Sequence, residues 1–169
     1  MFNSAQRRFE QTVRAYSADL YRYAYWLCRD RFVAEDLVQE SFTRAWNNWE
    51  SLKDAGAVKS WLITILRREH ARLYERKQFD YVDTELEDLQ IAADHDSVEL
   101  FHLENLLEEL PLTLREPFVM QALGGYSCAE IAQMLETTEG AVMTRLTRAR
   151  QALRGALAGS PIQSAKGAK

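Results

Sequence analysis

Apolar residues recur at intervals of three and four along most of the chain, which is the spacing of one buried face of an α-helix. In the first half of the chain this spacing predicts three amphipathic helices that can bury one small core between them. Asp30 is placed to cap the start of the second helix. The three apolar stripes consist of Phe9, Val13, Tyr16, Leu20, Tyr23, Ala24 and Leu27, of Ala34, Leu37, Val38, Phe42, Ala45, Trp46 and Trp49, and of Trp61, Leu62, Ile65, Leu66 and Leu73.

A second set of helices is predicted beyond residue 97. Thr113 with Glu116, and Ser127 with Glu130, have the spacing of capping boxes at helix starts. Strand-type alternation is absent and the chain has only 7 glycines and 3 prolines, so we predict an all-α fold. The apolar positions are Val98, Phe101, Leu106, Leu107 and Leu110 before a stop at Pro111, and then Leu114, Phe118, Val119, Ala122 and Leu123.

Residues 129–150, AEIAQMLETTEGAVMTRLTRAR, have the pattern of two helices joined by a tight turn. Thr137 or Thr138 can cap the second helix. Because arginine can bind guanine through two hydrogen bonds and threonine offers a hydroxyl and a methyl, the polar face of this helix can read bases in the major groove. The alternative is a plain helical hairpin with a solvated arginine face. The core positions are Val142, Leu146, Ala149 and Leu153, the polar face carries Met143, Thr144, Thr147, Arg148 and Gln151, and Arg145, Arg150 and Arg154 flank it as candidate phosphate contacts.

Charge is unevenly distributed along the chain. The formal net charge is −4, yet no Lys or Arg occurs between Lys77 and Arg115, a stretch that is rich in Asp and Glu. The acidic middle therefore separates two mildly basic blocks. We predict a folded block over residues 5–78, a flexible acidic linker over 79–97, a second folded block over 98–157 and a disordered tail over 158–169.

Several functional classes find little support in the sequence. Cys28 and Cys128 are far apart and have no partner at metal-ligand spacing, which favours reduced thiols in a cytoplasmic protein. No apolar signal region opens the chain and no stretch approaches ~18 apolar residues, so we expect neither export nor a membrane span. We expect no enzyme, no metal and no cofactor, because no nucleophile has a matching base and no phosphate-binding loop occurs. The three histidines, His70, His95 and His102, lie in unrelated contexts. We interpret Glu69 and His70 as a solvated pair on a basic helix.

Two stretches of the first block, AEDLVQESFTRAWNNW and VKSWLITILRREHARLYERK, resemble domain 2 of the extracytoplasmic-function (ECF, group IV) sigma factors of bacterial RNA polymerase. The second block, from LEELPLTLREPFVM through GYSCAEIAQMLETTEGAVMTRLTRARQAL, resembles domain 4 of the same family. The resemblance covers roughly residues 8–157 and places both motifs in the family's order. The domain 2 positions that match are Ala34, Glu35, Asp36, Leu37, Val38, Gln39, Phe42, Ala45, Trp46, Trp61, Leu62, Ile65 and Arg67.

The resemblance implies a protein that directs core RNA polymerase to promoters and starts transcription. Its implied partners are the β′ clamp helices of the polymerase for domain 2, the β flap for domain 4, promoter DNA and an anti-sigma factor. Acid and amide groups on one helix face can pair with arginines of a partner helix. Glu35 and Asp36 could also simply favour the start of their helix electrostatically, a reading that leaves Gln39 unexplained. The implied polymerase-binding residues are Glu35, Asp36, Gln39 and Glu40.

The loop over residues 51–57 and the helix after it resemble the part of the family that melts and reads the −10 element. A flipped base needs a small polar pocket, and the exposed strand needs stacking and positive charge. Trp61 can serve as a stacking surface or as part of the core. Arg68 stands where the family usually has Asn, which puts the −10 sequence preference in doubt. The implied −10 residues are Ser51, Lys53, Asp54, Lys59, Ser60, Trp61, Arg67, Arg68, Arg72 and Arg76, with Lys77 beside them.

The positions that match the family's −35 contacts lie on the polar face already picked out by periodicity. The acidic linker either imitates nucleic acid in a basic channel of the polymerase or acts as a solvated tether. A free-standing helix-turn-helix regulator is the competing interpretation, although it leaves the first block unexplained. The implied −35 residues are Thr138, Met143, Thr144, Arg145, Thr147 and Arg148.

Overall fold

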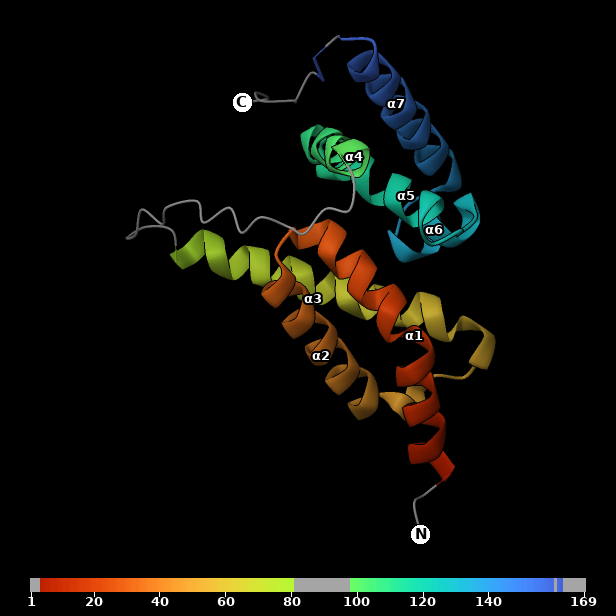
Figure 1. Cartoon of the computed structure of the whole chain (residues 1–169). Helices are drawn as coiled ribbons and strands as arrows, with labels where there is room; N and C mark the ends of the chain where they lie inside the picture. Colours follow the sequence, from red (N-terminus) through yellow and green to blue (C-terminus); the bar gives the residue numbers. More distant parts are fainter. Residues whose placement is uncertain (1–3, 81–97, 160, 163–169) are drawn as a thin grey trace. The chain divides into compact units, whose positions relative to one another are not determined.

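The computed structural model describes residues 4–80, 98–159 and 161–162 (Figure 1). Throughout these residues every regular element is a helix, which confirms the predicted all-α class. The chain divides into two compact units, Met1–Leu89 and Gln90–Lys169. Most of the predicted linker (79–97) and tail (158–169) lies outside the described residues.

The first unit contains three long helices, α1 (Ser4–Cys28), α2 (Arg31–Asn47) and α3 (Val58–Asp80), each packed against the other two. Two short 3₁₀ turns, Trp49–Ser51 and Ala55–Ala57, connect α2 to α3. Figure 1 shows α2 lying beside α3 and α1 crossing over them. The sequence pattern therefore predicted this bundle correctly.

The core of the first unit is built from the predicted stripes. Leu20, Leu37, Leu62 and Leu66 are almost fully buried where the three helices meet. Trp46 departs from its stripe, since 44% of it is exposed at the last turn of α2. The apolar stripe of α2 is wider than the surface that its neighbours cover, so Trp46 at the edge of the stripe stays partly exposed.

The connection from α1 to α2 is short and well capped. Arg29 takes a positive φ of 54°, and its N–H donates to the carbonyl of Tyr25 at 2.8 Å. Asp30 then accepts a hydrogen bond from the N–H of Val33 at 3.0 Å, as predicted for the cap of α2. Two residues thus suffice to reverse the chain and hold α1 against α2.

The second unit consists of α4 (Val98–Glu109), α5 (Leu112–Ala122), α6 (Cys128–Met134) and α7 (Glu139–Leu157). The long helix α7 packs against the other three. Its core face meets apolar residues of α4, α5 and α6 in one small core. Almost fully buried there are Leu107, Leu110, Val119, Met120, Ile131, Met134, Val142 and Leu146.

The two predicted capping boxes had opposite outcomes. At α6, the Ser127 N–H donates to Oε2 of Glu130 at 2.7 Å and the Glu130 N–H donates to Ser127 Oγ at 3.2 Å, as predicted. The Thr113–Glu116 box is wrong, because Pro111 caps α5 without a side-chain bond and Thr113 already lies within the helix. The fixed φ of Pro111, −52° here, starts the helix two positions earlier than the pattern predicted.

Arg115 helps to join α4 to α5. Its Nη2 donates to the carbonyls of Glu108 and Leu110 at 2.9 and 3.0 Å, and so satisfies acceptors that the end of α4 leaves open. The expected apolar positions Ala122 and Leu123 are exposed, since α5 ends at Ala122.

Candidate functional site

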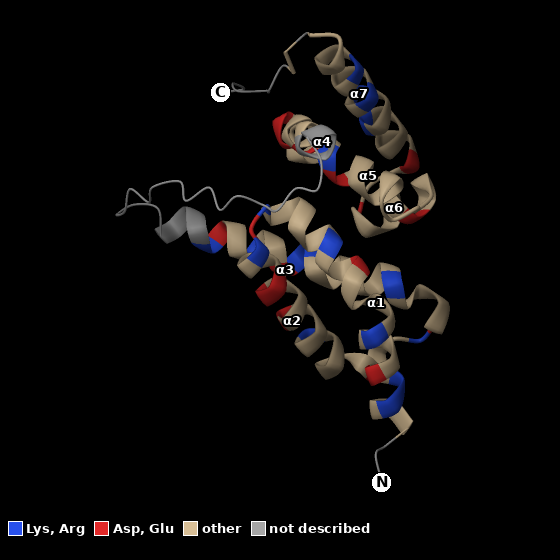
Figure 2. Ribbon diagram, viewed as in Figure 1, with Lys and Arg blue, Asp and Glu red and all other residues tan. Residues whose placement is uncertain are grey.

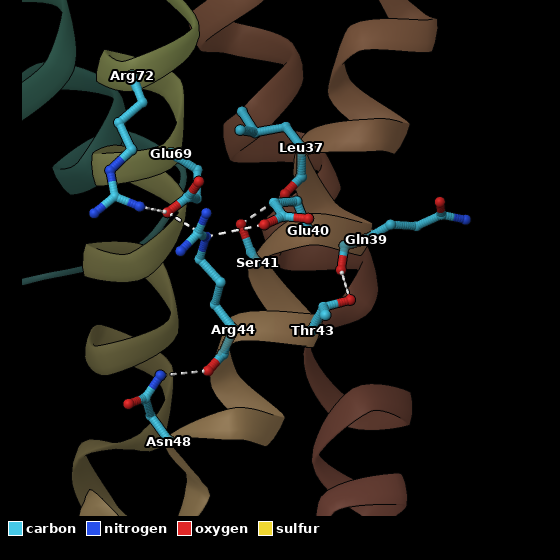
Figure 3. Close-up of polar contacts among 9 residues, drawn as sticks. All are labelled: Leu37, Gln39, Glu40, Ser41, Thr43, Arg44, Asn48, Glu69 and Arg72. Carbon is cyan, nitrogen blue, oxygen red and sulfur yellow. Dashed lines mark hydrogen bonds and ion pairs between the residues drawn. The ribbon is translucent and has the colours of Figure 1, made fainter.

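The exposed face of α2 carries the predicted polymerase-binding residues. Asp36 and Gln39 are exposed, and within the described residues their side chains make no hydrogen bond or ion pair. Glu35 instead pairs with Arg31 at 3.2 Å, along the same helix. Figure 3 shows Gln39 extending away from α3. Asp36 and Gln39 are therefore the members of the predicted set that are available to an external partner.

Glu40, the fourth predicted member, belongs to a chain of charges between α2 and α3 (Figure 3). Its Oε1 lies 2.9 Å from Nε of Arg44, and the same Nε lies 2.7 Å from Oε1 of Glu69 on α3. Nη1 of Arg72 donates a hydrogen bond to that Glu69 oxygen at 2.9 Å. The contacts of Arg44 Nε are ion pairs without hydrogen-bond geometry.

The interpretation of Glu69 as a solvated residue is wrong. Its side chain is only 8% exposed, although arginines stand before and after it on α3. A signal for this burial was present in the sequence. Leu62, Leu66, Glu69 and Leu73 follow one another at steps of four, three and four, so Glu69 occupies a position of the apolar stripe that faces α2.

The predicted −10 loop is stabilised by its own polar side chains. Ser51 Oγ donates to the Asn48 carbonyl at 2.7 Å, and Asp54 Oδ1 accepts from the Gly56 N–H at 2.8 Å. At the start of α3, Ser60 Oγ donates to the Ala57 carbonyl at 3.0 Å. These three residues thus shape the loop, and each oxygen keeps further hydrogen-bonding capacity for a nucleic acid.

The basic residues predicted around this loop fall into two groups. Lys59 pairs with Asp19 of α1 at 3.2 Å and Arg72 pairs with Glu69, so both are held by carboxylates. Lys53 and Arg76 are exposed and have no ion pair within the described residues. Arg67 is half-buried and Arg68 is exposed, both on α3. The side chain of Lys77 lies outside what the structure describes.

Trp61 lies in an aromatic cluster at one end of the first unit. Its ring centroid is 6.2 Å from that of Trp49, which is 5.1 Å from Phe9 of α1. Trp46 contacts the same Phe9 at 5.1 Å. Trp61 is half-buried, so part of its ring packs in this cluster and part remains accessible for stacking.

The second unit displays the predicted −35 face on α7. Met143 is 55% exposed, and Thr144, Thr147 and Arg148 are exposed beside it. The opposite face, Val142, Leu146, Ala149 and Leu153, is buried, as predicted. Figure 2 shows basic residues along the exposed length of α7.

The start of α7 is fixed by Thr138, whose Oγ1 accepts from the Ala141 N–H at 3.2 Å. This decides between the two candidate caps, Thr137 and Thr138. Thr144 and Thr147 donate to the carbonyls of Gly140 and Met143, each at 3.0 Å. Their hydroxyl oxygens remain acceptors and their methyl groups remain exposed.

The arginines of α7 differ in their surroundings. Arg145 and Arg148 have no hydrogen bond or ion pair within the described residues. Arg150, expected as a phosphate contact, donates a hydrogen bond to Gln121 of α5. Arg154 is exposed in the last turn. Arg145 and Arg148, which lie beside the predicted base-reading residues, are thus long side chains without a partner among the described residues.

The described part of the chain holds no group of three or more His, Cys, Asp and Glu residues arranged to bind a metal ion. Cys28 and Cys128 are half-buried, and neither forms a disulfide within the described residues. The helices that the structure describes include none with the length and apolar character needed to cross a membrane.

Comparison with known proteins gives two family matches in one chain. Residues 12–79 match Sigma-70 region 2 and residues 100–153 match Sigma-70 region 4. The chain is 31% identical over 165 residues to the ECF RNA polymerase sigma factor SigW of Bacillus subtilis, with 88% of each chain covered. It is 34% identical over 148 residues to ECF sigma factor SigL of Mycobacterium tuberculosis, with 82% of each covered.

Solved structures give the same result. The sigma factor RpoE in complex with the anti-sigma factor NepR from Bartonella quintana matches with a TM-score of 0.77 and 28% identity, over 90% of this chain and 98% of that one. CnrH in complex with the cytosolic domain of CnrY matches with a TM-score of 0.69 and 25% identity, over 91% and 90%. The chain belongs to the ECF sigma factors of bacterial RNA polymerase.

Proposed function

We propose that this sigma factor joins its polymerase through α2, opens promoters with the loop over residues 51–57 and α3, and reads the −35 element with α7. It acts as a promoter-specificity subunit and performs no covalent chemistry itself. The observation that carries the proposal is the division of α7 into a fully buried apolar face and an exposed Met-Thr-Thr-Arg face. A helix built in this way, braced by a short preceding helix, suits the major groove.

The contact with polymerase is made mainly by Asp36 and Gln39, whose exposed side chains have no partner within the described residues. Glu35 and Glu40 lie on the same exposed side of α2 and add negative charge beside them. An acidic helix face of this kind complements arginines on a partner helix, for which the β′ clamp helices are the proposed source. The second unit contacts the β flap in the same assembly.

For the −10 element, the loop with Ser51, Lys53 and Asp54 provides small polar groups for a flipped base. The exposed arginines of α3 attract the phosphates of the separated strands, and the Trp49–Trp61 cluster offers an aromatic surface. The −10 sequence preference depends in part on Arg68, which departs from the family's usual Asn.

For the −35 element, Arg148 and Arg145 supply hydrogen-bond donors, and Thr144, Thr147 and Met143 supply short polar and apolar contacts. Thr138 holds the first turn of α7 in place. One similar solved structure is a sigma factor in complex with an anti-sigma factor, and the other is CnrH in complex with the cytosolic domain of CnrY. We therefore include control by an anti-sigma factor and action in the cytoplasm in the proposal.

The competing function is a helix-turn-helix regulator that binds operators without polymerase. A mobility-shift experiment with promoter DNA, with and without core polymerase, distinguishes the two. We expect the isolated chain to bind poorly, since its net charge is −4, and specific binding to appear only with core enzyme. Tight and specific duplex binding by the isolated chain contradicts the proposal.

A further inference from the structure

Glu69 brings arginines from two helices to a single carboxylate oxygen (Figure 3). Arg44 reaches it from α2 at 2.7 Å, and Arg72 reaches it from the next turn of α3 at 2.9 Å. Arg44 also lies 2.9 Å from Glu40. We call Glu40, Arg44, Glu69 and Arg72 the α2–α3 charge network. Its charges alternate in sign from the surface of α2 to the surface of α3.

Stability alone does not explain a carboxylate at position 69. Its neighbours on the stripe that faces α2 are Leu62, Leu66 and Leu73, and an apolar side chain could continue that stripe. Removing a carboxylate from water is unfavourable, and well-packed apolar replacements of buried ion pairs are often neutral or stabilising. What Glu69 supplies, and a leucine could not, is a fixed anchor for two guanidinium groups.

The Arg72 side chain is 54% exposed even though it is anchored to Glu69. Its guanidinium has five N–H donors in a rigid plane, and the described contact with Glu69 uses Nη1. Figure 3 shows another terminal nitrogen of Arg72 directed away from Glu69. A guanidinium held at one edge by a carboxylate can present its other edge to a phosphate without first losing side-chain freedom.

The other end of the network reaches the proposed polymerase-binding face. Asp36, Glu40 and Arg44 follow one another at steps of four along α2, so they share one ridge of that helix. The network thus connects the ridge that begins at Asp36 with the basic side of α3.

We propose that Glu69 is a positioning residue for promoter opening. It contacts neither polymerase nor DNA, but anchors Arg72 to α2 through Arg44 and so aims the Arg72 guanidinium at a phosphate of the separated promoter strands. The inference rests on the proposed function, because it assumes that α3 faces promoter DNA in the holoenzyme.

The test compares Glu69→Gln with the unmodified full-length chain, each bound to core polymerase. Glutamine keeps the size and an acceptor oxygen but removes the charge that holds both arginines. We expect open complexes to form about tenfold more slowly, which corresponds to ~1.4 kcal/mol. The slope of the logarithm of this rate against the logarithm of the salt concentration should decrease by about the amount expected for the loss of one phosphate contact. Affinity for core polymerase should stay within about twofold.

The matched control is Glu75→Gln. Glu75 is an exposed carboxylate on the same helix and has no ion pair within the described residues, so this variant removes the same charge without releasing Arg72. It should open promoters at the unmodified rate or slightly faster, since it only makes α3 more positive. A defect equal to that of Glu69→Gln would show that the charge of α3, and not the position of Arg72, sets the rate.

A double-mutant cycle separates positioning from a general structural role. Arg72→Ala should show the same opening defect as Glu69→Gln, and the double variant should be no slower than Arg72→Ala alone. Additive defects overturn the inference. Thermal unfolding is measured on each protein, because equal losses of stability, core binding and opening would indicate a structural role only and would also overturn it.

Arg72→Lys keeps the inference testable even if Glu69→Gln does not fold. Glu69 then still pairs with Arg44, and the charge at position 72 is retained while the planar fork is lost. We expect most of the opening defect of Arg72→Ala to remain. An unmodified opening rate in Arg72→Lys, or a faster rate in Glu69→Gln, overturns the inference. Failure of the proposed function is a different result, in which the unmodified chain supports no promoter-specific transcription.

Discussion

The ring edge of Tyr126 occupies the space that a Cβ on Gly124 would need. A Cβ added at Gly124 would stand 2.5 Å from Cε2 of this ring and 2.6 Å from the carbonyl oxygen of Met120. The Gly124 N–H and the Tyr126 N–H both donate to that carbonyl, at 3.1 and 3.3 Å, so it cannot move aside. The turn between α5 and α6 therefore requires glycine at this position.

This relationship predicts a large effect of Gly124→Ala on the second unit. Either the buried Tyr126 or the end of α5 must shift, and we expect a loss of about 2–4 kcal/mol in the free energy of unfolding, as for other overpacked sites. Chemical denaturation of the full chain measures it. Gly140→Ala is the control, because nothing lies within 4 Å of a Cβ there. It should be neutral or slightly stabilising, since alanine favours a helix.

Asp36→Arg is predicted to abolish binding to core polymerase while the fold is retained. Asp36 is exposed and has no described partner, so nothing inside the protein depends on its charge. Circular dichroism checks the fold, and a pull-down or fluorescence titration with core enzyme measures the affinity. The control Glu10→Arg makes the same charge change on α1. Unchanged affinity in Asp36→Arg would count against the contact through α2.

Arg148→Ala is predicted to weaken −35-dependent transcription about tenfold to a hundredfold, the range for one specific base contact. Core binding should persist, because Arg148 lies on the exposed α7 face proposed to contact the −35 element, and the proposed clamp contact is made by α2. Transcription from promoters with intact and altered −35 elements measures the effect. The difference in transcription between Arg148→Ala and the unmodified protein should be smaller on the promoter with the altered −35 element. Loss of core binding would refute the assignment.

Glu130 is predicted to make the second unit sensitive to acid. The hydrogen bond from the Ser127 backbone N–H, and secondly the bond with the Ser127 side chain, hold the pKa of Glu130 below its ordinary value of 4.5. A carboxyl whose pKa is lowered by folding stabilises the folded state above its unfolded pKa. That stabilisation is lost as the pH falls from 4.5 through the folded pKa.

Carbon-detected NMR titration of the Glu130 carboxyl measures this pKa directly. Thermal unfolding of Glu130→Gln between neutral and acidic pH provides the matched comparison, because glutamine still accepts from the Ser127 N–H but does not titrate. The difference in stability between the two proteins should narrow below pH 4.5. A Glu130 pKa at or above the value for an unfolded chain would refute the predicted cap effect.

Periodicity predicted most of the fold because each helix buries a continuous apolar stripe. Leu62 and Leu66, or Val142 and Leu146, face the core in the predicted register. The errors occurred where a second influence outweighs that pattern. Pro111 starts α5 before Thr113 can cap it, and Glu69 enters an apolar stripe because two arginines neutralise it there.

The candidate site was only partly predictable for the same reason. Exposure of Asp36, Gln39 and Arg148 follows from their place opposite an apolar stripe. Whether a charged side chain is paired depends on contacts between helices. The Lys59–Asp19 pair joins α3 to α1, and the Arg44–Glu69 pair joins α2 to α3, over separations that no local pattern encodes.

Run-off transcription with core RNA polymerase on a promoter library can show whether this chain selects promoters for the polymerase. We expect transcripts only when both the chain and core enzyme are present, from promoters that share −35 and −10 elements. Arg148→Ala should lose selectivity at the −35 element, and changes in α3 should act at the −10 element. Core-dependent transcription without promoter selectivity, or no transcription at all, would contradict the proposed role as a promoter-specificity subunit.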